Sequence, residues 1–419
     1  MTYVWSALPF LAAAAACAWA ARTRIHWWAL VAAGAALLLL TAVFDNIMIA
    51  LDFFHYAPEH LAGLSIGAAP IEDFAYPIAG ALLLPACWHM LRARRRTSPA
   101  HTSPAHSSGA SPQPPRLSPQ VTPRAEGSPS FMRSLLPHLM LSSRPASWIN
   151  TAYPFGAAYV VVAHQIDWAV VVGVIFFLVP YNMAMYGIND VFDYESDLRN
   201  PRKGGIEGAL LDPSWHRPIL VSAAVGTIPF LLLLMVASGP ATWLALAVSM
   251  FAVVAYSAPG LRFKERPVLD SITSSTHFVS PAVVGLTLAF DRTEAAVPAT
   301  AYVVLAAFFL WGMAAHAFGA IQDVVPDREA RIASIATALG ARATVRLSVA
   351  LWAMAGVLML FTAWPGPLAA VIALPYLVIS VPWWKVSDEH SAQVNRSWRR
   401  FIWLNYFGGF IATMLLILA

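Results

Sequence analysis

The stretch Asn189-Asp190-Val191-Phe192-Asp193-Tyr194-Glu195-Ser196-Asp197 puts four carboxylates at the end of an apolar run that begins at Trp168. On a helix, Asp190, Asp193 and Asp197 fall within about 60° of one another and point the same way. Hard oxygen ligands on one face suit Mg²⁺ that is shared with a diphosphate. Basic residues follow directly, at Arg199, Arg202 and Lys203. The alternative is a solvated acidic helix end with a few surface ion pairs.

The composition around this stretch is that of a polytopic membrane protein, since 58% of the 419 residues are hydrophobic and 11% are charged. Apolar runs of about 20 residues predict twelve membrane-spanning helices, surrounded by membrane lipid. Three come first, at Val4–Ala21, Trp27–Leu51 and Ile71–Leu91. Nine follow, at Trp148–Ala163, Trp168–Ile188, Pro218–Ala237, Ala241–Ala258, Leu269–Phe290, Ala299–Ala320, Ala343–Ala363, Leu368–Trp384 and Phe401–Leu418. We therefore expect an all-α membrane protein with a three-helix module and a nine-helix module.

Lysine and arginine orient these helices, because the cytoplasmic loops of membrane proteins collect basic residues. With the N-terminus outside, Arg292 alone among the 26 Lys and Arg is predicted outside, and residues 189–197 lie at the cytoplasmic face. The net charge of +4 is then a sign of topology, and no arrangement of arginines and aromatics argues for nucleic-acid binding. Cys17 and Cys87 lie in apolar runs and are expected to be small buried hydrophobes.

Residues 97–132 differ in character from the rest of the chain. Eight of the positions 97–130 are Pro, and most others are Ser, Ala, Thr or Gly, which predicts a disordered cytoplasmic linker. The linker separates a first module, residues 1–96, from a second, residues 133–419. A tether raises the local concentration of one module near the other, which suggests consecutive steps on one lipid. The alternative is a neutral fusion of independent proteins.

A second pair of carboxylates, Asp323 and Asp327, stands four residues apart where another apolar run meets the predicted cytoplasmic side. The topology thus puts both acidic sites on one membrane face, where they can hold two metal ions around one diphosphate. A basic loop with Arg262 and Lys264 is predicted on the same face. This loop either binds the phosphate or simply marks the positive side of the bilayer.

The second module resembles the UbiA-type intramembrane prenyltransferases, whose motifs are Asn-Asp-x-x-Asp-x-x-x-Asp and Asp-x-x-x-Asp. Both motifs occur here with matching spacing and order. The resemblance implies Mg²⁺-dependent ionisation of an allylic diphosphate. It also implies two groups of metal ligands, namely Asp190, Asp193 and Asp197, oriented by Asn189, and Asp323 with Asp327.

Other residues of this module are candidates for supporting roles. The family's usual lysine after the second motif is not obvious here, which leaves Arg328 or Arg331 as a candidate for the phosphate. Tyr186 and Tyr256 are candidate ring faces that shelter an allylic cation by cation–π attraction. His316 is polar at membrane depth, so we expect it to face protein or a cavity.

The first module carries carboxylates at predicted membrane depth, with Asp45 in its second apolar run and Glu72 and Asp73 at the start of its third. Such residues are costly in hydrocarbon and are therefore functional candidates. A buried carboxylic acid can stay protonated and deliver its proton to an apolar substrate. The alternative is a favourable acidic first turn after Pro70.

The order Phe44-Asp45-Asn46, His55-Tyr56, Ile66-Gly67 and Pro70-x-Glu72-Asp73-x-x-Tyr76 resembles a subunit of the heterodimeric carotenoid cyclases. The motif of that family is Pro-x-Glu-Glu-x-x-Phe, so Asp73 and Tyr76 depart from it. The resemblance implies that Glu72 protonates a terminal double bond, after which the cation closes a six-membered ring. It also implies a partner, a second three-helix cyclase subunit.

Together the two resemblances imply a lycopene elongase fused to a C50 carotenoid cyclase subunit. The elongase would transfer five-carbon units from dimethylallyl diphosphate to both ends of lycopene. One alternative is a UbiA-type transferase that acts on an aromatic or other polyprenyl acceptor, with the N-terminal helices as an anchor. Another is an ion-coupled transporter, which inverted repeats or broken helices would support. The sequence shows neither sign.

Overall fold

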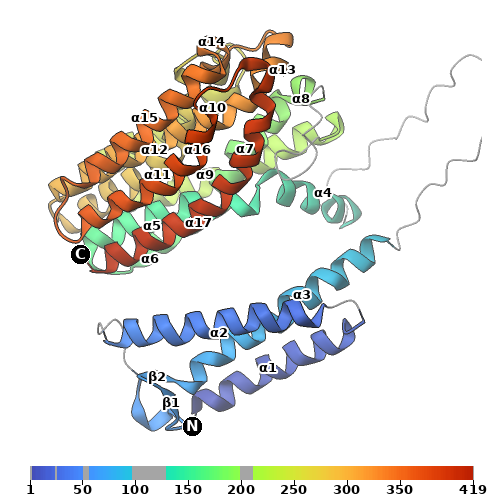
Figure 1. The fold of residues 1–419 in the computed structure, drawn as a ribbon, viewed down its shortest axis with the longest axis vertical. Helices are drawn as coiled ribbons and strands as arrows, with labels where there is room; N and C mark the ends of the chain where they lie inside the picture. Colours follow the sequence, from blue (N-terminus) through green and yellow to red (C-terminus); the bar gives the residue numbers. More distant parts are fainter. Residues whose placement is uncertain (1, 24–25, 51–55, 97–128, 199–210, 419) are drawn as a thin grey trace, which may run out of the picture. The chain divides into compact units, whose positions relative to one another are not determined.

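The computed structural model describes the chain except residues 1, 24–25, 51–55, 97–128, 199–210 and 419. The chain divides into two compact units, residues 1–117 and 118–419 (Figure 1). Apart from one short hairpin, every regular element in the described ranges is helical, which confirms the all-α prediction. Among the described residues, eight helical segments are long and apolar enough to cross a membrane. The count of twelve spans, their orientation and the proposed module boundaries stay predictions, and most of the predicted linker lies outside the described residues.

The described part of the first unit contains three long helices, α1 (Thr2–Ala20), α2 (Trp27–Ala50) and α3 (Ala75–Arg96). Both α1 and α2 pack against α3. The described connection between α2 and α3 holds the 3₁₀ turn η1 (Pro58–His60), the antiparallel strands β1 (Ser65–Ile66) and β2 (Ala69–Pro70), and the 3₁₀ turn η2 (Ile71–Phe74). The core is a small alanine cluster, and α2 buries none of its residues. The apolar surface of α2 therefore faces outward.

Asn46 of α2 fastens the hairpin to that helix. Its amide nitrogen donates to the carbonyl of Ile66 at 2.7 Å, and its amide oxygen accepts from the N–H of Ala68 at 2.6 Å. Gly67 has a φ of 68°, and a Cβ there would come within 2.1 Å of the Asn46 oxygen. The hairpin therefore requires glycine at this position, both for the backbone and for the close approach of the amide.

The second unit is a helical bundle, preceded by the helix α4 (Pro129–Ser142), which the sequence did not predict. Its other elements in the described ranges are η3 (Pro145–Ser147), α5 (Ile149–Ala163), α6 (Trp168–Leu178), α7 (Pro180–Phe192), α8 (Tyr194–Asp197), η4 (Pro213–Trp215), α9 (His216–Val236), α10 (Pro240–Ser257), η5 (Phe263–Glu265), α11 (Leu269–Thr293), α12 (Ala299–Ala320), η6 (Ile321–Asp323), α13 (Val324–Glu329), α14 (Ile335–Leu339), α15 (Ala341–Met359), η7 (Gly366–Ile372), α16 (Ala373–Ser380), η8 (Val381–Trp383), η9 (Asp388–Val394) and α17 (Asn395–Leu418).

Helix α11 lies at the centre of this bundle and packs against α5, α10 and α12. It buries polar as well as apolar residues along its length. Polar side chains in membrane helices face the protein interior, which is consistent with this central position. At Gly285 the backbone of α5 comes so close that a Cβ would lie 2.3 Å from the carbonyl oxygen of Phe155. The missing side chain therefore sets the distance between these two helices.

The apolar run that was expected as one helix, Trp168–Ile188, lies within one segment long enough to span a membrane, Trp168–Phe192, and this segment is interrupted at Val179. Helix α6 ends at Leu178, and α7 begins at Pro180, which has no N–H to continue the helix. The carbonyl of Phe177 at the break accepts from the hydroxyl of Thr151 at 2.7 Å and from the amide of Asn182 at 2.8 Å. Neighbouring side chains thus satisfy the break, as a helix within a membrane requires.

Candidate functional site

The polar end of α7 carries Asn189 and Asp190, and Asp193 follows directly. Asp190 is 0% exposed and Asp193 is 4% exposed, so these two carboxylates do not belong to a solvated helix end. The amide of Asn189 donates to the hydroxyl of Ser257 at 3.0 Å, which ties α7 to the end of α10. The side chain of Asp197 and the residues Arg199, Arg202 and Lys203 lie outside the described residues.

Each of the two buried carboxylates has a cation against it. Arg144 Nη2 donates to Asp190 Oδ1 at 2.9 Å, and the guanidinium lies 4.2 Å from the centre of the Tyr186 ring. Lys264 of η5 forms an ion pair with Asp193. Sequence reasoning named Lys264 as a phosphate ligand but did not single out Arg144, whose one signal is its place just before the apolar run of α5. Because burial makes unpaired charge costly, these carboxylates require positive charge.

Two more of the predicted phosphate ligands lie in the described residues, Arg262 and Arg328. Each forms an ion pair with a carboxylate other than Asp190 and Asp193. Arg262 forms an ion pair with Glu265, three residues further along the chain. Arg328 Nη1 lies 2.5 Å from Asp388 Oδ2, and Nη2 donates to the carbonyl of Thr337 at 3.0 Å. These contacts give Arg262 and Arg328 local structural partners.

The second acidic pair lies where α12 ends, with Asp323 closing η6 and Asp327 in α13; both are partly buried. Within the described ranges, no three His, Cys, Asp or Glu side chains are placed together to hold a metal ion. The meeting of the two acidic clusters around metal thus stays a prediction. The donor set itself fits Mg²⁺, since it consists of carboxylate and amide oxygens, and Arg144 and Lys264 supply the neutralising charge.

Several polar side chains continue from the acidic end of α7 into the interior of the bundle. The Tyr256 hydroxyl lies 3.3 Å from His316 Nε2, and the Ser271 hydroxyl lies 3.0 Å from His316 Nδ1. The prediction that His316 faces protein is confirmed. Tyr256 also meets His277 of α11 edge to face, with 5.1 Å between ring centres.

The UbiA prenyltransferase family matches residues 151–405 of the chain, which include the acidic end of α7 and both carboxylates after α12. The chain belongs to the UbiA prenyltransferase family. It is therefore an enzyme of the prenyltransferase class, which confirms the resemblance noted in the sequence.

Relatives are similar to both units. The C(50) beta-cyclic carotenoids biosynthesis protein LbtBC of Dietzia sp. (strain CQ4) is 47% identical, and the match covers 98% of this chain and 95% of the relative. A lycopene elongase/hydratase of Corynebacterium glutamicum is 52% identical, over 67% of this chain and 96% of the relative. A UbiA homologue of Archaeoglobus fulgidus, solved with DMAPP and Mg²⁺, is 21% identical with a TM-score of 0.49, over 64% of this chain and 98% of that chain.

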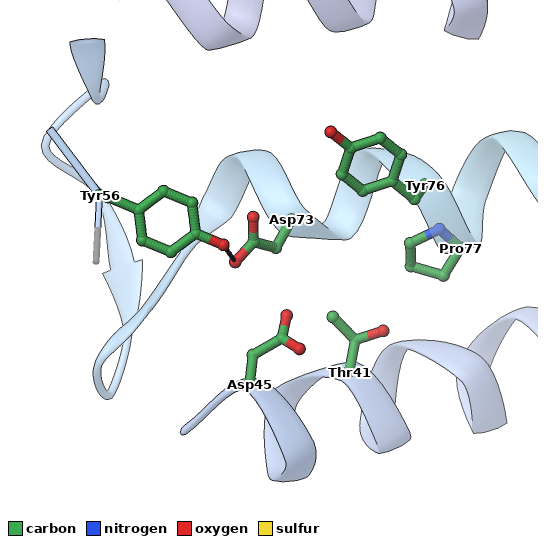
Figure 2. A pocket seen from close by; sticks show the side chains of 6 residues that line it. All are labelled: Thr41, Asp45, Tyr56, Asp73, Tyr76 and Pro77. Atoms are coloured by element: carbon green, nitrogen blue, oxygen red, sulfur yellow. Dashed lines mark hydrogen bonds between the residues drawn. The ribbon is translucent and has the colours of Figure 1, made fainter. Parts of the chain in front are cut away.

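The first unit, outside the UbiA match, contains a cavity of about 240 Å³ lined by Thr41, Asp45, Tyr56, Asp73, Tyr76 and Pro77. Figure 2 shows the carboxyl of Asp73 in η2 directed at the Tyr56 hydroxyl, while Asp45 extends from α2 on the opposite side. The carboxyl groups of Asp45 and Asp73 are within hydrogen-bonding reach, and the Tyr56 hydroxyl donates to Asp73 Oδ2 at 2.5 Å. Asp73 is 8% exposed. Two carboxyl groups that share one site are costly to ionise at the same time.

Glu72, the residue that the cyclase resemblance points to, is equally buried but does not line this cavity. Its Oε1 accepts from the backbone N–H of Ala62 at 2.5 Å. Glu72 therefore ties the loop before the hairpin to the start of α3, whereas Asp73 and Asp45 face the cavity.

Proposed function

We propose that this UbiA-family chain makes C50 carotenoids. The second unit would transfer dimethylallyl groups from dimethylallyl diphosphate to both ends of lycopene, and the first unit would cyclise the elongated ends together with a second three-helix subunit. The observation that carries the proposal is the similarity of the whole chain, both units in one order, to the C50 carotenoid protein of Dietzia. The relative from Corynebacterium, whose match covers 67% of this chain, supports lycopene as the acceptor.

In the transferase unit, Asp190, Asp193 and Asp197, with Asn189, would hold one Mg²⁺, and Asp323 with Asp327 would hold another. Bound Mg²⁺ would neutralise the diphosphate and stabilise it as a leaving group. Arg144 and Lys264 lie against these carboxylates, which supports a role for each in binding phosphate oxygens. The further predicted phosphate ligands are Arg199, Arg202, Lys203, Arg262 and Arg328.

The allylic carbon would lie beside the aromatic rings at this end of the bundle. The face of Tyr186 already holds the Arg144 guanidinium, which supports its use as a platform for positive charge. Tyr256 lies next to Ser257, the partner of Asn189. We place this end at the cytoplasmic face and the N-terminus outside, since Arg144 and Lys264 belong to the side rich in basic residues.

In the cyclase unit, we assign proton delivery to Asp73 with Asp45, since both face the cavity. The proton would add to the terminal double bond, the resulting cation would accept the electrons of a neighbouring double bond to close the ring, and loss of a proton would end the reaction. Tyr56 holds Asp73 in place. The outward apolar surface of α2 supports a second subunit as partner.

Expression in a lycopene-producing host, with and without a second cyclase subunit, tests this proposal. Wild type with the partner should give cyclic C50 product, and Asp73→Asn or Asp45→Asn should accumulate elongated acyclic carotenoid. Elongation by the same chain then shows that the variant chain is made and that its second unit is active. Glu72→Gln keeps an oxygen for Ala62 and should still cyclise.

Three results would count against parts of the proposal. Unchanged lycopene with the wild-type chain would refute the elongase function. Cyclic product without a second subunit would refute the proposal that cyclisation needs that partner. If Asp73→Asn still cyclises and Glu72→Gln does not, the proton donor is Glu72, as the family resemblance implies. Asp212→Asn, at an exposed turn, serves as the matched substitution control.

A further inference from the structure

His277 is a buried imidazole that the proposed reaction has not yet used. It lies in the central helix α11 and is 4% exposed. Its Nε2 has no hydrogen-bond partner among the described residues, while the ring is within hydrogen-bonding reach of the backbone of Ala252 in α10. A neutral imidazole whose proton is on Nδ1 presents Nε2 as a free lone pair. Such an atom is costly to bury without a partner and needs an explanation.

The backbone at His277 is fixed from two neighbouring helices. Pro281, four residues later, has no N–H to donate to the carbonyl of His277. The hydroxyl of Tyr181 in α7 donates to that carbonyl instead, at 3.2 Å, and accepts in turn from Ser249 of α10 at 3.2 Å. The imidazole is therefore held at a defined place in the bundle and not merely packed there.

The position of His277 relates it to the predicted diphosphate site. Tyr256 lies between His277 and the predicted diphosphate site. The ring of Tyr256 contacts His277, and the next residue, Ser257, accepts a hydrogen bond from Asn189 of the acidic motif. His277 comes eight residues after the start of α11, about 12 Å along the helix axis. The nearby His316 is different, because both of its nitrogens have polar partners. Unlike His316, His277 therefore has a buried ring nitrogen, Nε2, that can accept a proton from an apolar substrate.

We infer that His277 Nε2 is the base that ends the prenyl transfer, an assignment that rests on the proposed function. The π electrons of the acceptor's terminal double bond form the new C–C bond, while the donor's C–O bond breaks and diphosphate leaves with that electron pair. The acceptor then carries a tertiary cation. Transfer of a proton from an adjacent C–H to Nε2 leaves the C–H electrons as a new double bond. If water adds its oxygen to the cation, the water proton goes to Nε2 instead.

The test compares wild type, His277→Gln and His277→Ala as full chains in membranes, with lycopene, dimethylallyl diphosphate and Mg²⁺. Glutamine keeps a donor for Ala252 but supplies no base, so we expect elongation to fall about 100-fold. The ratio of alkene to alcohol ends, measured by mass spectrometry, should also change. Added imidazole should restore part of the activity of His277→Ala, which a purely structural role would not produce. His164→Gln, at the exposed end of α5, is the control.

Two outcomes would overturn the inference, and they are distinguishable. If wild-type membranes leave lycopene unchanged, the proposed acceptor is wrong and this assignment fails with it. If wild type elongates lycopene and His277→Gln does so at the same rate with the same product ratio, the assignment alone is wrong, and the departing diphosphate is the better candidate for the base.

Discussion

Replacing Asp190 by Asn should lower both the stability and the activity of the second unit, for two separable reasons. The first is the ion pair with Arg144, in which the Asp190 side chain is 0% and the Arg144 side chain 20% exposed. Removing one partner of a buried pair costs about 3–5 kcal/mol, because the other charge stays buried. Since Arg144 is partly exposed and keeps its contact with Tyr186, we expect about 3 kcal/mol, the lower end of that range.

The second reason is the predicted metal site. A bound metal ion stabilises the transition state by several kcal/mol, and about 1.4 kcal/mol corresponds to a tenfold change in rate. Asp190→Asn should therefore slow elongation at least about 100-fold even in the fraction of protein that stays folded.

The double variant Arg144→Met with Asp190→Leu separates the two effects. Apolar side chains of similar volume often replace a buried ion pair without loss of stability, so thermal unfolding in detergent should return close to wild type. Elongation of lycopene in membranes should stay at least about 100-fold slower than in wild type, because no carboxylate is restored. Wild-type stability of Asp190→Asn would refute the ion-pair reasoning, and elongation by the double variant at the wild-type rate would refute the metal assignment.

Pro281 within α11 and the 3₁₀ element η9 before α17 provide two further tests. Tyr181→Phe should cost about 1 kcal/mol, and less in a Pro281→Ala background, where a backbone N–H is restored to the helix; equal losses in a double-mutant cycle of thermal unfolding would contradict this. Burial alone would raise the pKa of the Asp388 carboxyl. Hydrogen bonds from the Ala341 backbone and the Arg328 side chain outweigh burial and hold this pKa below its ordinary value. The stability that Asp388 contributes is present above its pKa in the unfolded chain and is lost as the pH falls through its pKa in the folded protein. In Asp388→Asn, the stability of the protein should therefore fall less steeply as the pH is lowered into the acid range. An unchanged fall would contradict this prediction.

The acidic motifs were predictable from the sequence because they depend on local order. Asp190 and Asp193 stand in one helical turn, and the helix period alone puts them on one side. The cation against Asp190 was not predictable in this way, since Arg144 lies 46 residues earlier and the pairing exists only once α7 and the segment before α5 pack together. Burial of the pair likewise depends on tertiary structure.

Three other features needed the structure for a similar reason. The break before Pro180 was hidden by the length of the apolar run around it, although a proline within such a run is a local signal. In the first unit the sequence marked Asn46 and Gly67 as parts of one motif, but their role as a clamp on the hairpin follows from their contact. The choice between Glu72 and Asp73 depends on which carboxyl faces the cavity, which adjacent residues in a sequence do not reveal.

The central claim is that the UbiA unit adds dimethylallyl groups to lycopene with Mg²⁺ held at its acidic end. Membranes that contain the wild-type chain, incubated with lycopene and dimethylallyl diphosphate, test it most directly when the carotenoid mass is measured with Mg²⁺ and after its removal by a chelator. The account predicts lycopene carrying a five-carbon unit at each end with Mg²⁺ and unchanged lycopene without it. Unchanged lycopene in both samples, while an aromatic acceptor is prenylated by the same membranes, would contradict it.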